Sequence, residues 1–372
     1  MTNVNIDIQT IESHEVKELY IAATPSGAAP IEVMIREAFK GVSDVLKANR
    51  ANILQERIFA SSEMMECVRD ARKAAYGEFD DGVSPTLLVC QDGAAGSFAG
   101  IQVHAVASGT SVKVVYDQGM GVGRLIDTPN GQFVTLSEIA QPELNNPDEQ
   151  AMGMLHKAKR ILRSLGADFK TVARTWMWLN DILSWYDTFN RIRNVFFAEQ
   201  GILSNRSENR TPASTGVGLA PANGTSCAMD LVAILKPPDS IDYIHTSDKQ
   251  QSAFEYGSAF SRATRVPSPA SQVVYISGTA AIDAKGATTY LNNPDGQIKD
   301  TIDNVKAVMR QMDCLENQVL QAVAYCKDMT IEQAFNQVRH ELPWPWITII
   351  CDICRDDLLF EIEAVVESSP RH

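Results

Sequence analysis

The sequence predicts an α+β fold with two copies of one unit, each a mixed sheet covered by two helices, behind an N-terminal extension. Three observations support this: short alternating or β-branched apolar segments, segments with helical apolar spacing, and an ordered match between the two halves of the chain. The 372 residues are 45% hydrophobic and 21% charged, an ordinary globular composition with enough apolar residues for more than one core.

The first 136 residues carry short strand signals. Residues 86–90 (TLLVC) read as a buried strand, and the alternation over residues 100–117 predicts a hairpin that turns near Ser108-Gly109. A Pro129-Asn130-Gly131 turn precedes a further strand at 132–136. Residues 1–85 are interpreted only as an extension.

Helical spacing begins at residue 151. Residues 151–165 place apolar side chains three and four apart, and Gly166 follows as a C-terminal stop. Residues 171–179 (TVARTWMWL) predict a strand, and apolar residues from Trp185 to Phe196 mark a second helix. Two further strands are expected at 215–219 and 226–235.

A polar segment at 236–258, which contains Pro237-Pro238, is the predicted domain boundary. The expected domains are therefore 1–240, holding the extension and the first unit, and 241–372, holding the second unit. The elements predicted in the second unit follow the order of the first: strand 272–277, helix 298–312, strand 319–326, helix 331–339, and strands 347–351 and 358–366.

The two units also match residue by residue. A shift of 147 places Lys159 on Lys306, Arg163 on Arg310 and Asp181 on Asp328; a shift of 146 places Phe189 on Phe335, Asn190 on Asn336 and Arg193 on Arg339. An ordered series with one gap indicates duplication. Since each unit leaves one sheet face uncovered, we expect the copies to face each other, with a cleft between them.

Charge and cysteine content narrow the function classes. The formal net charge of −13 disfavours nucleic acid and anionic membranes as partners. The seven scattered cysteines do not suggest a disulfide framework. The polar N-terminus and the absence of long apolar runs predict a cytoplasmic protein without a membrane span.

Three segments of the second unit resemble the RidA (YjgF) family. They are residues 260–266 (FSRATRV), 275–279 (YISGT) and 359–364 (LFEIEA), in the family's order. The family's Pro-Ala-Arg-Ser segment is altered in both units, to Pro-Ala-Ser-Thr at 212–215 and Pro-Trp-Pro-Trp at 343–346. Because imine-hydrolysing members use that arginine to hold the substrate carboxylate, its loss argues against imine hydrolysis.

A tandem RidA-like chain with a long extension is similar to the chorismatases, which residues 173–197 and 212–232 also resemble. The resemblance implies cleavage of the enolpyruvyl ether of chorismate to pyruvate plus 3-hydroxybenzoate, a dihydroxy-cyclohexadiene carboxylate, or a mixture that includes 4-hydroxybenzoate. It implies no cofactor, and either a monomer or a RidA-like trimer. The glycines of Gly119-x-Gly121-x-Gly123 precede no predicted helix and give no dinucleotide site, and the histidines show no metal-ligand pairing.

Two glutamates are the candidate catalytic residues. Glu361 and Glu363 alternate along the last strand and therefore share one face, while Phe360, Ile362 and Ala364 share the other. Protonating an enol ether carbon requires a neutral acid, and a second carboxylate nearby raises the pKa of the first. Glu361 holds the active-site position of the RidA family and is the expected acid, with Glu363 as its tuning partner.

The substrate dianion requires cations and hydrogen-bond donors. The candidates that could bind it are Arg262, Arg265, Arg174, Arg193, Tyr275, Thr215 and Ser214. Ala263 is expected to line the pocket, on the resemblance alone. Two other functions stay open at this stage: a RidA-type imine or enamine hydrolase, and a non-catalytic protein that binds small metabolites.

Overall fold

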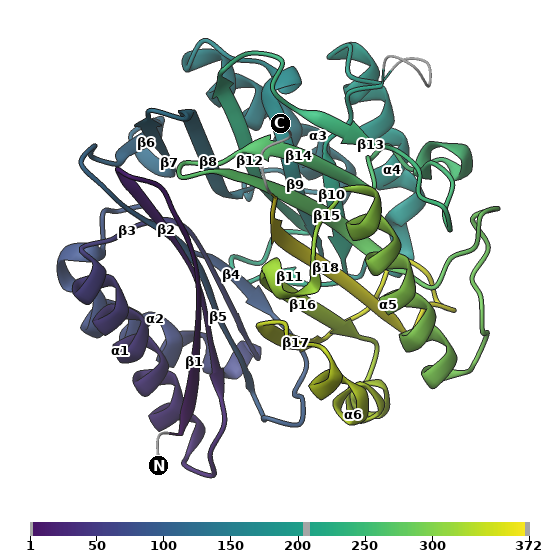
Figure 1. Ribbon diagram of the computed structural model, residues 1–372, viewed down its shortest axis with the longest axis horizontal. Coiled ribbons are helices and arrows are strands. Elements are labelled where there is room, and N and C mark those ends of the chain that lie inside the picture. Colours follow the sequence, from purple (N-terminus) through teal and green to yellow (C-terminus); the bar gives the residue numbers. More distant parts are fainter. Residues whose placement is uncertain (1–2, 204–208, 369–372) are drawn as a thin grey trace.

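The computed structural model describes residues 3–203 and 209–368. Within them the chain forms three six-stranded sheets whose helices lie on the outside (Figure 1). Short 3-10 turns join several elements: η1 (Ser62–Met64), η2 (Gly77–Phe79), η3 (Phe169–Thr171), η4 (Ala253–Tyr256), η5 (Glu316–Gln318) and η6 (Arg339–Glu341).

The N-terminal sheet has the order β1-β2-β5-β3-β4-β11 and is covered by α1 and α2. Its strands are β1 (Val4–Glu12), β2 (Val16–Pro25), β3 (Asn52–Ala60), β4 (Thr86–Val89), β5 (Phe98–Ser108) and β11 (Ala220–Pro221). Its helices are α1 (Ile31–Asn49) and α2 (Met65–Tyr76). The helices bury Ile35, Phe39 and Val68 against the sheet, as their apolar spacing dictates.

The middle sheet has the order β10-β9-β12-β8-β7-β6 and is covered by α3 and α4. Its strands are β6 (Lys113–Asp117), β7 (Met120–Thr128), β8 (Gly131–Ile139), β9 (Val172–Leu179), β10 (Ala213–Val217) and β12 (Cys227–Lys236). Its helices are α3 (Pro147–Ser164) and α4 (Ile182–Glu199).

The C-terminal sheet has the order β13-β14-β15-β18-β16-β17 and is covered by α5 and α6. Its strands are β13 (Asp242–Ile244), β14 (Ala263–Pro267), β15 (Gln272–Ala280), β16 (Val319–Cys326), β17 (Trp346–Ile350) and β18 (Phe360–Glu367). Its helices are α5 (Pro294–Gln311) and α6 (Met329–Val338).

The predicted repeat is confirmed, and the topology extends it. The orders β7-β8-β12-β9-β10 and β14-β15-β18-β16-β17 are the same, with the last-named pair parallel in each. The extension repeats this order once more as β1-β2-β5-β3-β4, with β3 and β4 parallel. Its side chains share no ordered match with the other two units, so the likeness is visible only in the topology.

The predicted hairpin over residues 100–117 is wrong. β5 pairs with β2 and β3 in the N-terminal sheet, whereas β6 pairs with β7 in the middle sheet. The turn at Ser108-Gly109 is therefore a crossing between two sheets. Local alternation fixes the faces of a strand but not its neighbour.

The uncovered faces of the three sheets pack against one another at the centre of the molecule. One apolar cluster there takes residues from all three sheets, including Tyr20, Trp176 and Tyr275. The rings of Trp176 and Tyr275 meet edge to face with their centroids 6.3 Å apart. Three interfaces between units result, and any cleft between units must open at one of them. No helix in the described residues is long and apolar enough to cross a bilayer.

Candidate active site

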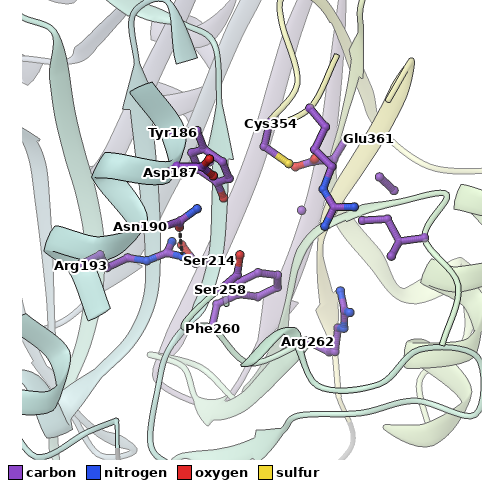
Figure 2. A pocket seen from close by; sticks show the side chains of 15 residues that line it. Tyr186, Asp187, Asn190, Arg193, Ser214, Ser258, Phe260, Arg262, Cys354 and Glu361 are labelled. Atoms are coloured by element: carbon purple, nitrogen blue, oxygen red, sulfur yellow. Dashed lines mark hydrogen bonds between the residues drawn. The ribbon is translucent and has the colours of Figure 1, made fainter. Parts of the chain in front are cut away.

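A pocket of about 130 Å³ opens between the middle and C-terminal units (Figure 2). The middle unit contributes side chains from α4 and β10, and the C-terminal unit contributes β15, β18 and the loop before β18. The lining residues are Tyr186, Asp187, Asn190, Arg193, Ser214, Gly216, Ser258, Phe260, Arg262, Gly278, Ala280, Ile282, Cys354, Arg355 and Glu361.

Glu361 is the acidic side chain that β18 presents to this pocket. It pairs with Ala280 on one side and Tyr325 on the other, on the sheet face that looks away from the helices. Its carboxyl group lies against the backbone of β15: a Cβ on Gly278 would be only 2.0 Å from its Oε1 atom. The absence of a side chain at residue 278 therefore makes room for the carboxyl group.

The environment of Glu361 favours its neutral form. The residue is 4% exposed, and no group in the described residues donates a hydrogen bond to its carboxyl oxygens. Burial, and secondarily the charge of Glu363, raises the pKa of Glu361 to about 8, although Arg174 acts in the opposite direction. At neutral pH this group is mostly a carboxylic acid, the form that proton donation requires.

Glu363 shares the strand face of Glu361 but has different partners. Its two oxygens accept hydrogen bonds from Arg174 Nη2 at 2.7 Å and from Trp176 Nε1 at 2.9 Å. Glu363 and Arg174 are both buried where the three sheets meet, and neither lines the pocket that contains Glu361. Glu363 acts on Glu361 through its charge.

Three arginines line the pocket, and each donates a hydrogen bond to a neighbouring amide or backbone carbonyl oxygen. Arg193 Nη2 donates to Asn190 Oδ1 at 2.7 Å. Arg262 donates from Nε and Nη2 to the carbonyl of Gln251 at 3.2 and 2.9 Å, and Arg355 Nη1 donates to the carbonyl of Gly286 at 2.7 Å. A chain of net charge −13 thus concentrates cationic groups in one pocket.

Of the residues predicted to bind substrate, Arg193, Arg262 and Ser214 come together here. Ser214 Oγ accepts from Thr175 Oγ1 at 3.0 Å, and its N–H donates to Ser277 Oγ at 2.8 Å. Thr215 lies just behind the lining, where its Oγ1 accepts from the N–H of Gly278 at 2.9 Å. Thr215 therefore helps to fix the backbone on which the Glu361 carboxyl group rests.

The structure places four other predicted residues outside the pocket. Arg174 and Tyr275 lie in the centre between the sheets, and Arg265 donates to the carbonyl of Met312 at the end of α5. Ala263 packs in the core beneath α5 and α6.

Several lining residues were missed by sequence reasoning. Tyr186 and Asn190 share one face of α4 with the predicted Arg193, at spacings of i, i+4 and i+7 that could have marked them. Cys354 and Arg355 lie in a loop and carry no such signal. Burial, and then the charge of Glu361, raises the pKa of the Cys354 thiol to about 12, so it stays protonated at neutral pH.

Comparisons with known proteins agree with this architecture. Residues 250–368 match the family model described as endoribonuclease L-PSP. A crystal structure of a chorismatase aligns with a TM-score of 0.62 at 20% identity, covering 85% of this chain and 93% of that one. Two smaller structures align with about one third of this chain. A structural-genomics protein, YJGH, does so at 16% identity (34% of this chain, 97% of that one, TM-score 0.30), and a YjgF-family protein from Neisseria meningitidis at 15% (35% and 97%, TM-score 0.28).

No curated protein matches the chain significantly. The chain is built on a RidA-like scaffold and shares the overall fold of a solved chorismatase.

Proposed function

We propose that this protein is a chorismatase that releases pyruvate from chorismate, giving 3-hydroxybenzoate or a dihydroxy-cyclohexadiene carboxylate. The observation that carries the proposal is a desolvated glutamic acid, Glu361, inside a pocket lined by Arg193, Arg262 and Arg355. The fold shared with a chorismatase supports the same assignment.

Glu361 supplies the proton that the enol ether requires. Its carboxylic acid donates to the terminal methylene carbon, which becomes a methyl group, and the adjacent carbon becomes an oxocarbenium centre. Glu361 is left as a carboxylate. Water can then add to that centre, returning a proton to Glu361, and the hemiketal collapses to pyruvate and the dihydroxy-cyclohexadiene acid.

The second product requires no net water. If a hydroxyl group of the ring displaces the protonated enolpyruvyl ether, the bond between the ring carbon and the ether oxygen breaks and pyruvate leaves. The hydroxyl proton returns to Glu361, and the ring aromatises to 3-hydroxybenzoate. Pyruvate and 3-hydroxybenzoate together contain the same atoms as chorismate. Both routes share the proton transfer from Glu361, and of the two we favour 3-hydroxybenzoate.

The arginines of the pocket could bind the two carboxylates of the substrate. Chorismate has two carboxylates, and guanidinium groups bind carboxylates with paired, charge-assisted hydrogen bonds. Arg193 approaches from the middle unit, whereas Arg262 and Arg355 come from the C-terminal unit. The substrate would thus be held between two units, with the enolpyruvyl group at Glu361.

The arrangement also supports activity as a monomer. RidA-like trimers build their sites between subunits, and this chain contains three units of one topology. The interface that carries the site is therefore formed within a single chain.

The test is to incubate the purified protein with chorismate, without added metal or cofactor. Pyruvate is followed by a coupled assay and the ring product by chromatography. We expect one pyruvate per aromatic or diene acid formed. A folded protein that forms no pyruvate would overturn the proposal, and ammonia released from an enamine substrate would indicate the imine-hydrolase alternative.

A further inference from the structure

A second pocket, of about 310 Å³, lies between the N-terminal and C-terminal units. Here β17 contacts β2 and β5 of the N-terminal sheet, and α6 follows β16 nearby (Figure 1). The residues from α6, η6 and β17 that line it are Glu332, Asn336, Arg339, Trp346, Thr348 and Ile350. The facing wall is formed by residues 24–27 at the end of β2, Ala99 of β5, and Gln91 with the loop 93–96.

This pocket corresponds to the proposed active site by internal symmetry. The shift of 146 that places Asn190 and Arg193 on Asn336 and Arg339 moves an Asn-x-x-Arg pair from one pocket to the other. The neighbouring strands correspond as well. On the middle sheet Ser214 of β10 pairs with Thr175 of β9, and on the C-terminal sheet Trp346 of β17 pairs with Ala322 of β16. Because the shift of 147 places Thr175 on Ala322, Trp346 stands where Ser214 stands in the first pocket.

The acid is missing from the second pocket. In the C-terminal sheet, Glu361 on β18 pairs with Tyr325 on β16. In the N-terminal sheet the corresponding pair is Gly100 on β5 and Phe59 on β3, both on the inner side of the molecule. With glycine at the position of Glu361, this pocket offers no equivalent proton donor. It is equipped to bind a ligand but not to protonate one.

Glu332 brings a carboxylate into the second pocket from α6. Its Oε2 accepts a hydrogen bond from the N–H of Ala94 at 2.7 Å, and a Cβ on Gly93 would lie 3.1 Å from the same oxygen. The glutamate therefore rests on the glycine-containing loop. Its Oε1 has no hydrogen-bond donor within residues 3–203 and 209–368.

Other polar groups of the lining also lack partners in the described chain. The exposed side chain of Arg339 makes no hydrogen bond or ion pair there. Asn336 Oδ1, Trp346 Nε1 and Thr348 Oγ1 are buried without a hydrogen-bond partner. Since buried polar groups in folded proteins are normally paired, this concentration around one cavity points to a polar ligand.

We infer that this pocket binds, without turnover, a small ring-containing carboxylic acid that also carries a hydrogen-bond donor. The ligand carboxylate pairs with the guanidinium of Arg339, and a hydroxyl or ammonium group donates to Glu332 Oε1. These two residues are seven positions apart, about 10 Å along a helix. One ring with polar groups at both ends, each reaching its partner through a hydrogen bond, spans such a gap.

The test is isothermal titration calorimetry of the full chain with 3-hydroxybenzoate, and with benzoate, which lacks the donor. The variants are Arg339→Gln, Arg262→Gln in the first pocket, and Arg36→Gln, an exposed arginine on α1 outside both pockets. We expect Arg339→Gln to weaken 3-hydroxybenzoate binding about tenfold or more, with pyruvate release unchanged. We expect benzoate to bind more weakly than 3-hydroxybenzoate, and Arg36→Gln and Arg262→Gln to leave this binding intact.

The inference fails if wild type binds no 3-hydroxybenzoate, or if Arg262→Gln removes all binding while Arg339→Gln has no effect. Only the choice of 3-hydroxybenzoate as probe rests on the proposed function. A protein that forms no pyruvate but loses binding in Arg339→Gln would refute the proposed function and leave this inference standing. Normal pyruvate release, together with 3-hydroxybenzoate binding that Arg339→Gln does not change, would refute this inference and leave the proposed function standing.

Discussion

Gly278 and Glu361 are in such close contact that residue 278 has no room for a side chain. A Cβ there would lie 2.0 Å from the Oε1 of Glu361 and 3.0 Å from its carboxyl carbon. The N–H of Gly278 is in turn held by Thr215, which belongs to the middle unit. The position of the acid is thus fixed by contacts from two units.

Gly278→Ala is expected to displace the Glu361 carboxyl group and lower kcat about tenfold or more, because a proton donor must be within hydrogen-bond reach of its target. The control is Gly109→Ala, in the crossing between β5 and β6 and outside the pocket lining, where an added Cβ would meet nothing within 4 Å. Steady-state pyruvate release by both variants checks the prediction. Equal activity in the two variants would show that this contact does not position the acid.

The pH dependence of turnover should follow the raised pKa of Glu361, about 8. The acid form dominates below that pH and is lost above it. We therefore expect kcat/KM, which reports the pKa values of the free enzyme, to hold steady through neutral pH and to fall about tenfold per pH unit well above pH 8. Activity that instead rises as the pH increases through the pKa of Glu361 would mean that this residue acts as a carboxylate.

The same pKa predicts a pH-dependent stability. The unfolded chain releases this proton near pH 4.5, the ordinary pKa of a glutamate, whereas the folded protein keeps it up to about pH 8. The contribution of the neutral carboxyl to stability is fully present below pH 4.5 and is lost as pH rises to 8. Thermal unfolding of wild type should therefore lose more stability between pH 5 and 8 than Glu361→Gln does, and parallel curves would contradict this.

Arg262→Ala should weaken substrate binding, with a KM raised about tenfold and a smaller change in kcat, because a carboxylate contact made before and during the reaction is lost. Arg191→Ala is the control, since Arg191 is exposed on α4 and does not line the pocket. An unchanged KM in a folded Arg262→Ala variant would remove this residue from the site.

Arg174→Met should act on stability. It leaves the buried carboxylate of Glu363 without its 2.7 Å partner, and breaking such a pair costs about 3–5 kcal/mol of unfolding free energy. Denaturant unfolding measures this cost. A stable variant with a raised KM would instead support the original prediction that Arg174 binds the substrate.

Local patterns carried most of the fold prediction. Two equivalent units could be identified from the spacing of apolar residues in α3 and α5 and from an ordered series of matches. That series runs from Lys159 to Arg193 in the middle unit and recurs from Lys306 to Arg339 in the C-terminal unit. The N-terminal unit has the same strand order without matching side chains, so no repeat in the sequence reveals it. The pairing of β5 and β6 in different sheets is likewise a non-local choice.

The candidate site was harder to predict for the same reason. Alternation placed Glu361 and Glu363 on one face, but it could not show that Glu363 is paired with Arg174 while Glu361 faces a pocket. The contact with Gly278 depends on the irregular register between β15 and β18, and Arg355 reaches the pocket from a loop. These relationships exist only once the sheets are packed together.

The role of Glu361 as the acid is tested by pyruvate release from chorismate, measured side by side for wild type and Glu361→Gln at pH 7. Glutamine has nearly the same shape but cannot donate a carboxylic proton, so we expect a fall in kcat of about 10²–10⁴-fold with the fold and ligand binding retained. Near-normal turnover by a folded Glu361→Gln variant would show that this glutamate does not protonate the substrate.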